Sequence, residues 1–204
     1  MIRVAFGFLL GLACALLLVK GGCVKDLVGA DDPAPVAIAG CDVTPVFDQD
    51  YFPALHEALT NARKSVVCIM YRASYGKNPK HREHQLIEAL VEAHKRGVKV
   101  EMVLDANKTY WEKDKEKKDE IEAKNEEALA RLKEAGVPVF TDGLDTVTHS
   151  KILVIDGETV FIGSANWTGA ALKDNHEANL RIRSKPLAKQ ITELLAKIER
   201  KTPD

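Results

Sequence analysis

The chain has 204 residues and a formal net charge of −1, with 29 Lys and Arg against 30 Asp and Glu. This length fits one domain of ordinary size, and a 46% share of hydrophobic residues allows a substantial core. The near balance of charge excludes a generally basic nucleic-acid binder, so any binding of nucleic acid must depend on local clusters of Lys and Arg.

Residues 1–22 predict a signal peptide or an N-terminal membrane anchor. Arg3 precedes sixteen uncharged, mostly apolar residues, 4–19, and Lys20 ends this run. The run is long for the apolar part of a signal peptide and slightly short for a membrane span, so cleavage and retention both stay open. In either case the segment would engage a membrane or the secretion machinery. We therefore expect an exported protein, periplasmic or anchored to a membrane and facing outside the cytoplasm.

Residues 23–42 predict an extended linker, because they contain two prolines, Pro33 and Pro35, and show no core periodicity. A Gly-Gly-Cys sequence ending at Cys23 suggests lipidation of that cysteine, although Lys20 fits this poorly and simple cleavage nearby is the alternative. Cys23 and Cys41 would be able to pair in an oxidising compartment, but the sequence does not establish this.

Residues 43–204 alternate strands and helices and predict one folded domain. The expected strands are 43–47, 65–71, 98–104, 137–141 and 178–183, with two more in the motif described below. The expected helices are 51–63, 83–96, a long charged helix that ends near residue 136, and 186–200. Repeated strand–helix–strand units indicate an α/β fold with a mixed sheet and helices on both faces. Within the charged helix, 111–128 favours a solvated surface, with a substrate rim or partner surface as the alternative.

A dense group of polar residues lies within 149–166 and comprises His149, Lys151, Asp156, Gly163, Ser164 and Asn166. The apolar runs between them predict two strands that turn at Asp156 and the glycine after it. Residues two apart on a strand face the same way, so we expect His149 and Lys151 to share one face. The hairpin would return Ser164 and Asn166 beside them. An imidazole, an ammonium, a hydroxyl and an amide together suit a phosphate group.

This pattern resembles the signature of the phospholipase D superfamily, His-x-Lys-x4-Asp-x6-Gly-Ser-x-Asn, and matches it at every position. Glu177 follows Asn166 by eleven residues, where small bacterial nucleases of the superfamily carry an acidic residue. The resemblance covers Val43 to Lys197. It implies a layered α-β-α sandwich with a mixed central sheet, phospholipase D-like, and a catalytic domain over 43–204.

The resemblance also implies a catalytic role for His149, Lys151 and Glu177. His149 would attack phosphorus and form a phosphohistidine, which divides one difficult displacement into two easier ones. Lys151, Ser164 and Asn166 would bind the phosphate and stabilise the charge that develops on its oxygens. Glu177 would hydrogen-bond a catalytic imidazole, with a surface salt bridge as the alternative.

Asp156 and Gly163 belong to the signature, but we expect them to be structural. Asp156 falls at the predicted turn, away from the converging side chains, so a scaffold role is favoured over proton transfer. Cys68 lies within the predicted strand 65–71 and is expected to be buried there. Trp167, just after Asn166, is expected in the core, with a stacking platform for a ligand as the alternative.

The chain has only one His-x-Lys pair, whereas the chemistry needs a second acid to protonate the leaving oxygen. The resemblance implies a homodimer in which His149 of each copy faces the other across a two-fold axis. The scheme requires no metal and no cofactor, because Lys151 and an imidazolium supply the positive charge.

Three hypotheses remain for the substrate. The first is an exported endonuclease on DNA or RNA, for which a basic loop at Arg72, Lys77, Lys80 and Arg82 would follow the phosphate backbone, unless it only solvates the surface. The second is a phospholipase D that hydrolyses membrane phospholipids, although no apolar patch suited to insertion is evident. The third is a non-catalytic phosphate-binding module, against which the intact nucleophile argues.

Overall fold

The computed structural model describes residues 41–106, 125–143 and 146–203. Its strands are β1 (Asp42–Pro45), β2 (Ser65–Met70), β3 (Lys99–Leu104), β4 (Val139–Thr141), β5 (Lys151–Ile155), β6 (Thr159–Gly163) and β7 (Asn179–Arg183). Its helices are the 3-10 turn η2 (Asp48–Asp50), α1 (Tyr51–Asn61), α2 (Arg82–Lys95), α4 (Glu126–Glu134), α5 (Gly169–Lys173) and α6 (Lys185–Leu195). The predicted signal or anchor, nearly all of the linker, and most of the charged segment lie outside the described residues.

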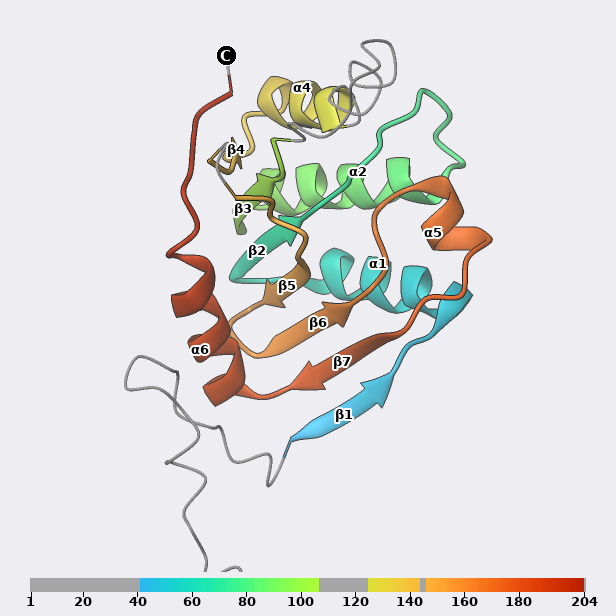
Figure 1. The fold of residues 1–204 in the computed structure, drawn as a ribbon, viewed down its shortest axis with the longest axis vertical. Coiled ribbons are helices and arrows are strands. Elements are labelled where there is room, and N and C mark those ends of the chain that lie inside the picture. Colours follow the sequence, from blue (N-terminus) through green and yellow to red (C-terminus); the bar gives the residue numbers. More distant parts are fainter. Residues whose placement is uncertain (1–40, 107–124, 144–145, 204) are drawn as a thin grey trace, which may run out of the picture. The chain divides into compact units, whose positions relative to one another are not determined.

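The strands form one seven-stranded sheet in the order β1-β7-β6-β5-β2-β3-β4. β2, β3 and β4 run parallel, whereas β5, β6, β7 and β1 are antiparallel to their neighbours. The sheet therefore changes from parallel to antiparallel between β2 and β5 (Figure 1). The predicted hairpin is confirmed, with Ile155 opposite Thr159 on β5 and β6.

Helices cover both faces of this sheet. α1, α2 and α4 pack on one face over the larger hydrophobic cluster (Figure 1). Leu55 and Leu59 lie one turn apart on α1 and are fully buried in that cluster. α6 packs on the other face, where Ala188 and Leu195 join a smaller cluster with Val154. These layers confirm the α-β-α sandwich with a mixed sheet.

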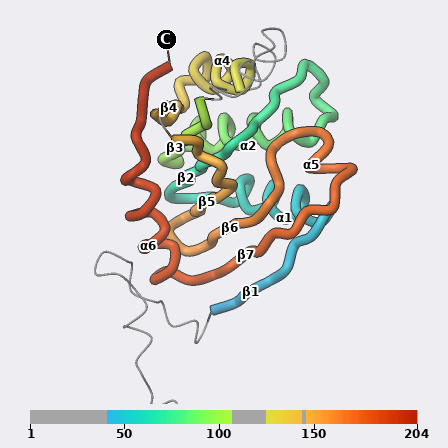
Figure 2. Tube along the Cα trace, in the orientation of Figure 1, coloured from blue at the N-terminus to red at the C-terminus, as the bar shows by residue number. Residues whose placement is uncertain are grey.

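Two features near the C-terminal end of the chain differ from the sequence prediction. α5 was not expected, and it begins at a Thr168 cap whose hydroxyl accepts the backbone N–H of Ala171. α6 ends at Leu195 and not at Arg200 as predicted. The chain beyond α6 is held by tertiary contacts: Arg200 donates to Glu101 on β3, 2.8 Å away. The main chain of Lys201 then pairs in both directions with Thr141 of β4 (Figure 2).

The described residues contain two cysteines. Cys68 on β2 is fully buried, as predicted, and burial raises the pKa of its thiol. Cys41 is a free thiol, and its possible partner Cys23 lies outside the described residues. None of the helices in the described ranges combines the length and apolar character needed to cross a membrane.

Candidate active site

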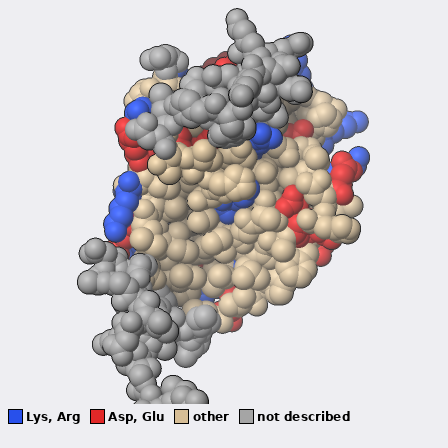
Figure 3. All heavy atoms as spheres, viewed as in Figure 1, with Lys and Arg blue, Asp and Glu red and all other residues tan. Residues whose placement is uncertain are grey.

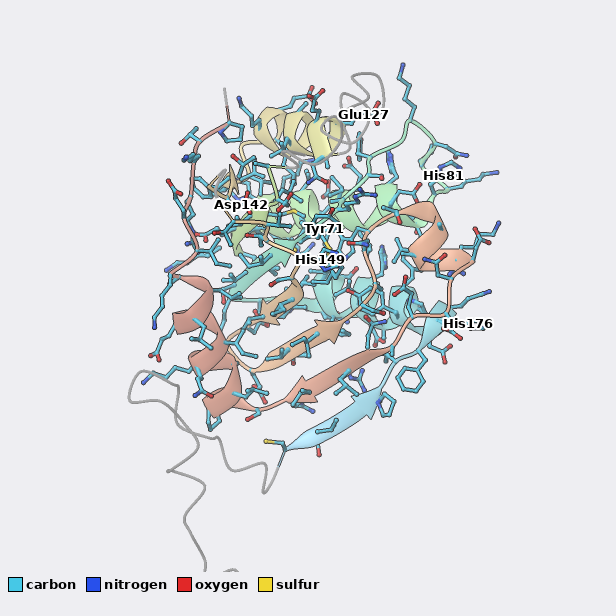
Figure 4. All side chains as sticks on the ribbon, in the orientation of Figure 1. Tyr71, His81, Glu127, Asp142, His149 and His176 are labelled. Carbon is cyan, nitrogen blue, oxygen red and sulfur yellow. The ribbon has the colours of Figure 1, made fainter. Side chains whose placement is uncertain are left out.

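All signature residues except Asp156 gather at one edge of the sheet, where β2, β3 and β4 end and β5 begins. His149 lies two residues before the start of β5 proper, and Lys151 is the first residue of that strand. β6 ends at Gly163, so Ser164 and Asn166 follow at the same edge. Figure 4 shows His149 beside Tyr71, the residue that follows β2. Carboxyl ends of parallel strands are a usual location for ligand sites in α/β sheets.

His149 and Lys151 are in direct contact, as their shared face predicted. The Lys151 Nζ atom lies 3.2 Å from Nδ1 and 3.5 Å from Nε2 of the imidazole, and donates to the His149 carbonyl at 2.8 Å. His149 is exposed, whereas Lys151 is only 6% exposed. The His149 imidazole therefore faces solvent above a nearly buried cation.

The surroundings of His149 favour its neutral form. Burial lowers the pKa of the imidazole below its ordinary value, and the charges of Lys151 and Arg72 lower it further. A neutral imidazole is the nucleophilic form, so the environment suits attack on phosphorus near neutral pH. Burial likewise lowers the pKa of Lys151, while Glu177 raises it.

Glu177 contacts Ser164 in this structure. The Ser164 hydroxyl donates to Glu177 Oε2 in a short hydrogen bond and accepts the Ala178 N–H at 3.0 Å. Asn175 donates to the other carboxylate oxygen at 3.0 Å. Among the described residues, Glu177 forms neither a hydrogen bond to His149 nor a salt bridge. Its predicted contact with a catalytic imidazole therefore stays a prediction.

Two polar groups at the site have unused hydrogen-bonding capacity. The Asn166 Oδ1 atom and the Arg72 Nε atom are both buried, and neither has a partner among the described residues. Buried polar atoms normally have hydrogen-bond partners. The Asn166 amide and the Arg72 guanidinium, each with one unpaired buried atom, would therefore suit a polar ligand at the site. Asn166 was predicted to bind phosphate, and this geometry is compatible with that role.

Gly163 is required because β6 and β7 approach closely there. A Cβ atom at this position would lie 2.6 Å from Asn179 Cα and would also collide with the Ala178 carbonyl oxygen. Asn179 is buried, and its side chain accepts the Ala165 N–H at 3.1 Å and donates to Val46 O at 3.3 Å. The glycine and this amide together fix the loop that carries Ser164.

Asp156 lies at the opposite end of the hairpin from His149. It has a positive φ of 55°, and its carboxylate accepts the backbone N–H groups of Arg63, Lys64 and Ser65 at 2.7 to 3.1 Å. Desolvation, the largest influence, raises the pKa of Asp156, but these N–H groups together outweigh it and the net pKa is lowered. The carboxylate thus ties the hairpin to the turn between α1 and β2.

Sequence reasoning missed the residues behind His149. Asp105 and Asp142, just after β3 and β4, are both buried, and both accept the Thr148 N–H, at 2.7 and 3.1 Å. Asp142 also accepts the Ala106 N–H at 2.7 Å. These carboxylates hold the main chain immediately before His149. Their location after consecutive parallel strands was the available signal.

Asn125 and Asp48 support the site from other segments and were also missed. The buried Asn125 side chain accepts the Ala73 N–H and donates to the carbonyls of Tyr71 and Asp105, all within 3.0 Å. Asp48 accepts the Glu177 N–H at 2.7 Å, and this bond is the main reason its pKa is lowered. Both residues join strand ends that are distant in the sequence.

The predicted basic loop is divided in the structure. Arg72 lies at the site, where its charge lowers the pKa of His149. Arg82 instead begins α2, with its guanidinium 5.4 Å from the Phe52 ring centroid and donating to the Leu172 carbonyl. Lys77 and Lys80 are exposed. Figure 3 shows Lys and Arg atoms at the centre of the face that bears the site, with mostly uncharged residues around them and a group of Asp and Glu atoms to the right.

Three aromatic side chains outside the signature differ in their exposure. Trp167 is fully buried and belongs to the core, as predicted. His176 is exposed and lies 3.2 Å from Asp48 (Figure 4). His84 is half-buried; its ring stacks on Tyr75 with centroids 4.6 Å apart and forms a hydrogen bond with the Gly76 carbonyl.

Comparison with known proteins agrees with this geometry. Residues 55–198 match the family described as "Cardiolipin synthase, PLD-like domain". A phospholipase D of Rickettsia typhi is 31% identical over 132 residues, 65% of this chain and 54% of that protein. A mitochondrial cardiolipin hydrolase of Canis lupus familiaris is 27% identical over 156 residues, 76% of this chain and 53% of that protein. The chain thus spans about half the length of these curated relatives.

Solved structures share the fold. Nuc from Salmonella typhimurium, a phospholipase D family member, superposes with a TM-score of 0.62 at 22% identity, over 80% of this chain and 99% of that chain. NucT from Helicobacter pylori gives a TM-score of 0.59 at 21% identity, over 79% and 99% of the two chains. The family match covers most of the chain, the fold agrees, and the signature residues meet at one sheet edge: the chain belongs to the PLD-like family of the phospholipase D superfamily.

Proposed function

We propose that this chain is a phosphodiesterase that acts through a phosphohistidine at His149 and needs no metal ion. The observation that carries the proposal is the contact of an exposed imidazole, whose pKa is lowered, with the nearly buried Lys151 ammonium. The imidazole is suited to attack, and the ammonium to neutralising charge on the phosphoryl oxygens. The open amide of Asn166 supplies a further polar group at the same edge.

The reaction has two steps. In the first, the lone pair of His149 forms a bond to phosphorus, the bond to the leaving oxygen breaks, and that oxygen takes a proton from a second imidazolium. In the second, water attacks the phosphohistidine, the second imidazole takes a proton from the water, and the phosphorus–nitrogen bond breaks. Both imidazoles return to their starting states.

The second imidazole comes, in this proposal, from His149 of another copy. Within the described residues, the signature supplies a single histidine to the site. A half-covered apolar sheet face supports docking of a second copy: Ile152, Ile162 and Leu180 are half-buried in adjacent strands, and Val43 is 46% exposed. An isologous dimer would place two equivalent sites together.

For the substrate, we propose DNA or RNA cleaved by an exported endonuclease. The exposed Lys77 and Lys80 follow the β2 end on the same loop as Arg72, and they supply cations that suit neighbouring phosphates of a polynucleotide. The apolar segment before residue 20 supports export.

Phospholipid is the second candidate substrate, and specific observations favour it. The Lys and Arg atoms at the centre of the site face form a small group bordered mostly by uncharged residues (Figure 3), which suits a single phosphate group better than a long polyanion. Val147, two residues before His149, is 47% exposed. The curated relatives named above are a phospholipase D and a cardiolipin hydrolase.

One assay separates these candidates. Purified protein is incubated with plasmid, single-stranded DNA and RNA, and separately with vesicles of phosphatidylcholine and of cardiolipin, all in EDTA. We expect cleavage of nucleic acid in EDTA. Hydrolysis of lipid alone would replace the first substrate by the second, and activity that appears only when a divalent ion is added would contradict the metal-independent chemistry. Cleavage of no substrate would favour a phosphate-binding module.

A further inference from the structure

The ring of Tyr71 borders the nucleophile and two cations of the site. Its centroid lies 4.3 Å from the His149 ring centroid, with a tilt of 48° between the planes (Figure 4). The Lys151 Nζ atom lies 4.8 Å from the same centroid, and the Arg72 guanidinium carbon 5.2 Å. No other aromatic ring in the described residues makes more than one such cationic contact. The ring is therefore placed to affect all three groups.

We propose that Tyr71 is a positioning residue that holds the His149 imidazole in the orientation needed for attack on phosphorus. The inference rests on the proposed phosphohistidine chemistry. It adds a residue outside the signature, one that precedes His149 by 78 positions in the chain.

Lys151 does not fix the imidazole orientation by itself. Its ammonium lies at nearly equal distances from the two ring nitrogens, 3.2 and 3.5 Å. A donor that points along one lone pair would be clearly nearer to one nitrogen than to the other. The exposed His149 side chain therefore needs another contact to restrict its rotation, and the Tyr71 ring supplies it.

The backbone of Tyr71 is fixed relative to the nucleophile. Its N–H donates to the carbonyl of Ser150, the residue between His149 and Lys151, at 2.9 Å. Its own carbonyl accepts the Asn125 side chain at 3.0 Å. The ring thus extends from a main chain that is hydrogen-bonded both to the catalytic segment and to a buried amide, so its position is well determined.

The ring also reduces the cost of bringing cations together. Arg72 and Lys151 both lower the pKa of His149, which is the sign of mutual repulsion. The negative face of an aromatic ring attracts nearby cations. Tyr71 therefore allows Lys151 and Arg72 to remain close to an imidazole that becomes positively charged when it is phosphorylated or protonated.

The test compares Tyr71→Phe, which keeps the ring, with Tyr71→Leu and Tyr71→Met, which remove it. We expect kcat of the Phe variant within about 3-fold of wild type and kcat of the Leu and Met variants at least about 10-fold lower, with KM little changed, because misplacing a reacting group by ~1 Å costs up to about 100-fold. In parallel, ¹³C relaxation of the labelled His149 ring should show an ordered side chain in wild type and Tyr71→Phe, and a mobile one in Tyr71→Leu.

Tyr75→Leu is the matched control, since it removes another half-buried tyrosine that stacks on a histidine, His84, outside the site. It should lower thermal stability without changing kcat or the order of the His149 ring. The proposal is overturned if the Leu and Met variants keep kcat within 3-fold of wild type, or if the His149 ring stays ordered without Tyr71. The relaxation experiment needs no turnover. A wild type that is inactive on every substrate would refute the proposed function, but the order of the His149 ring would still show whether Tyr71 positions it.

Discussion

Two regions of the molecule build the site, and they are organised differently along the chain. The β5–β6 hairpin and its flanks supply His149, Lys151 and Asn166 from eighteen consecutive residues, 149–166. The carboxyl ends of β2, β3 and β4 supply Tyr71, Asp105 and Asp142 from widely separated positions. The comparison teaches that the proposed reacting groups are local in sequence, whereas the groups that hold them in place are assembled only by the fold.

The largest effect is expected from the hairpin. His149→Ala removes the nucleophile and should lower kcat by at least about 10⁴-fold, the scale seen when an enzyme loses its attacking group. In a dimer with one His149 from each copy, mixing this variant with wild type should not restore full activity per dimer. His81→Ala, which removes an exposed histidine at the start of α2, is the control and should retain activity. Full activity of pure His149→Ala would refute the assignment.

A smaller loss is expected from the parallel strands. Asp142→Asn replaces one of the two carboxylate oxygens that accept the Thr148 and Ala106 N–H groups with an amide donor. The mismatch should cost ~1–3 kcal/mol of unfolding free energy, and the displaced segment before His149 should lower kcat about 10-fold. Urea unfolding and steady-state kinetics measure the two effects. Asp174→Asn, at an exposed carboxylate, serves as the control. If kcat is the same in Asp142→Asn as in this control, the hydrogen bonds of Asp142 do not contribute to catalysis.

Asp156 tests whether every signature residue is catalytic. Asp156→Asn should destabilise the fold by ~1–2 kcal/mol at pH 7, since the three backbone N–H groups lose a charged acceptor, while kcat stays within about 2-fold. The pKa of Asp156 is lowered in the folded state, so its stabilisation is present above the ordinary Asp pKa and is lost as pH falls through the lowered value. The free energies of unfolding of wild type and Asp156→Asn, measured by denaturation, should therefore become similar at acid pH. A large loss of kcat in a folded variant would contradict the scaffold role.

The smallest expected change is a shift in pH dependence. Burial lowers the pKa of His149 most, followed by Lys151 and Arg72. Arg72→Gln removes one of these charges and should raise that pKa toward its ordinary value. The acid limb of kcat/KM, where the nucleophile becomes protonated, should then move to higher pH. Lys80→Gln removes an exposed charge on the same loop and should not shift the acid limb. A shift of the limb to lower pH in Arg72→Gln would contradict the claim that the Arg72 charge lowers the pKa of His149.

The order of strands and helices could be predicted from the sequence because apolar periodicity and turn residues act locally. The hairpin is an example: Asp156 and Gly157 both adopt positive φ, as the turn between two apolar runs requires. The end of α6 could not be predicted, since the contact of Arg200 with Glu101 draws the chain away from the helix axis. α5 was missed because five residues are too few for a helical pattern to be recognised.

The candidate site was only partly predictable for the same physical reason. Strand alternation and the hairpin turn predicted that His149, Lys151, Ser164 and Asn166 converge, and the resemblance to the phospholipase D signature implied their roles. A lone Asn125 within a charged stretch carries no local indication that it joins the ends of β2 and β3. Asp48 is similar, because its role depends on a main-chain contact with Glu177, 129 positions away. Such supports are determined by tertiary pairing, which one sequence does not reveal.

The pairing of Lys201 with Thr141 has a practical consequence. β4 is the last strand on its side of the sheet, and an unpaired outer strand is a template for adding strands of other molecules. Lys201 thus occupies the main-chain hydrogen-bonding groups of Thr141 on this outer strand. A deletion from Arg200 onward would leave the main chain of Thr141 open to pairing with another molecule. The yield of soluble protein should then fall, even though the candidate active site is unchanged. Affinity tags are better placed where they leave this pairing undisturbed.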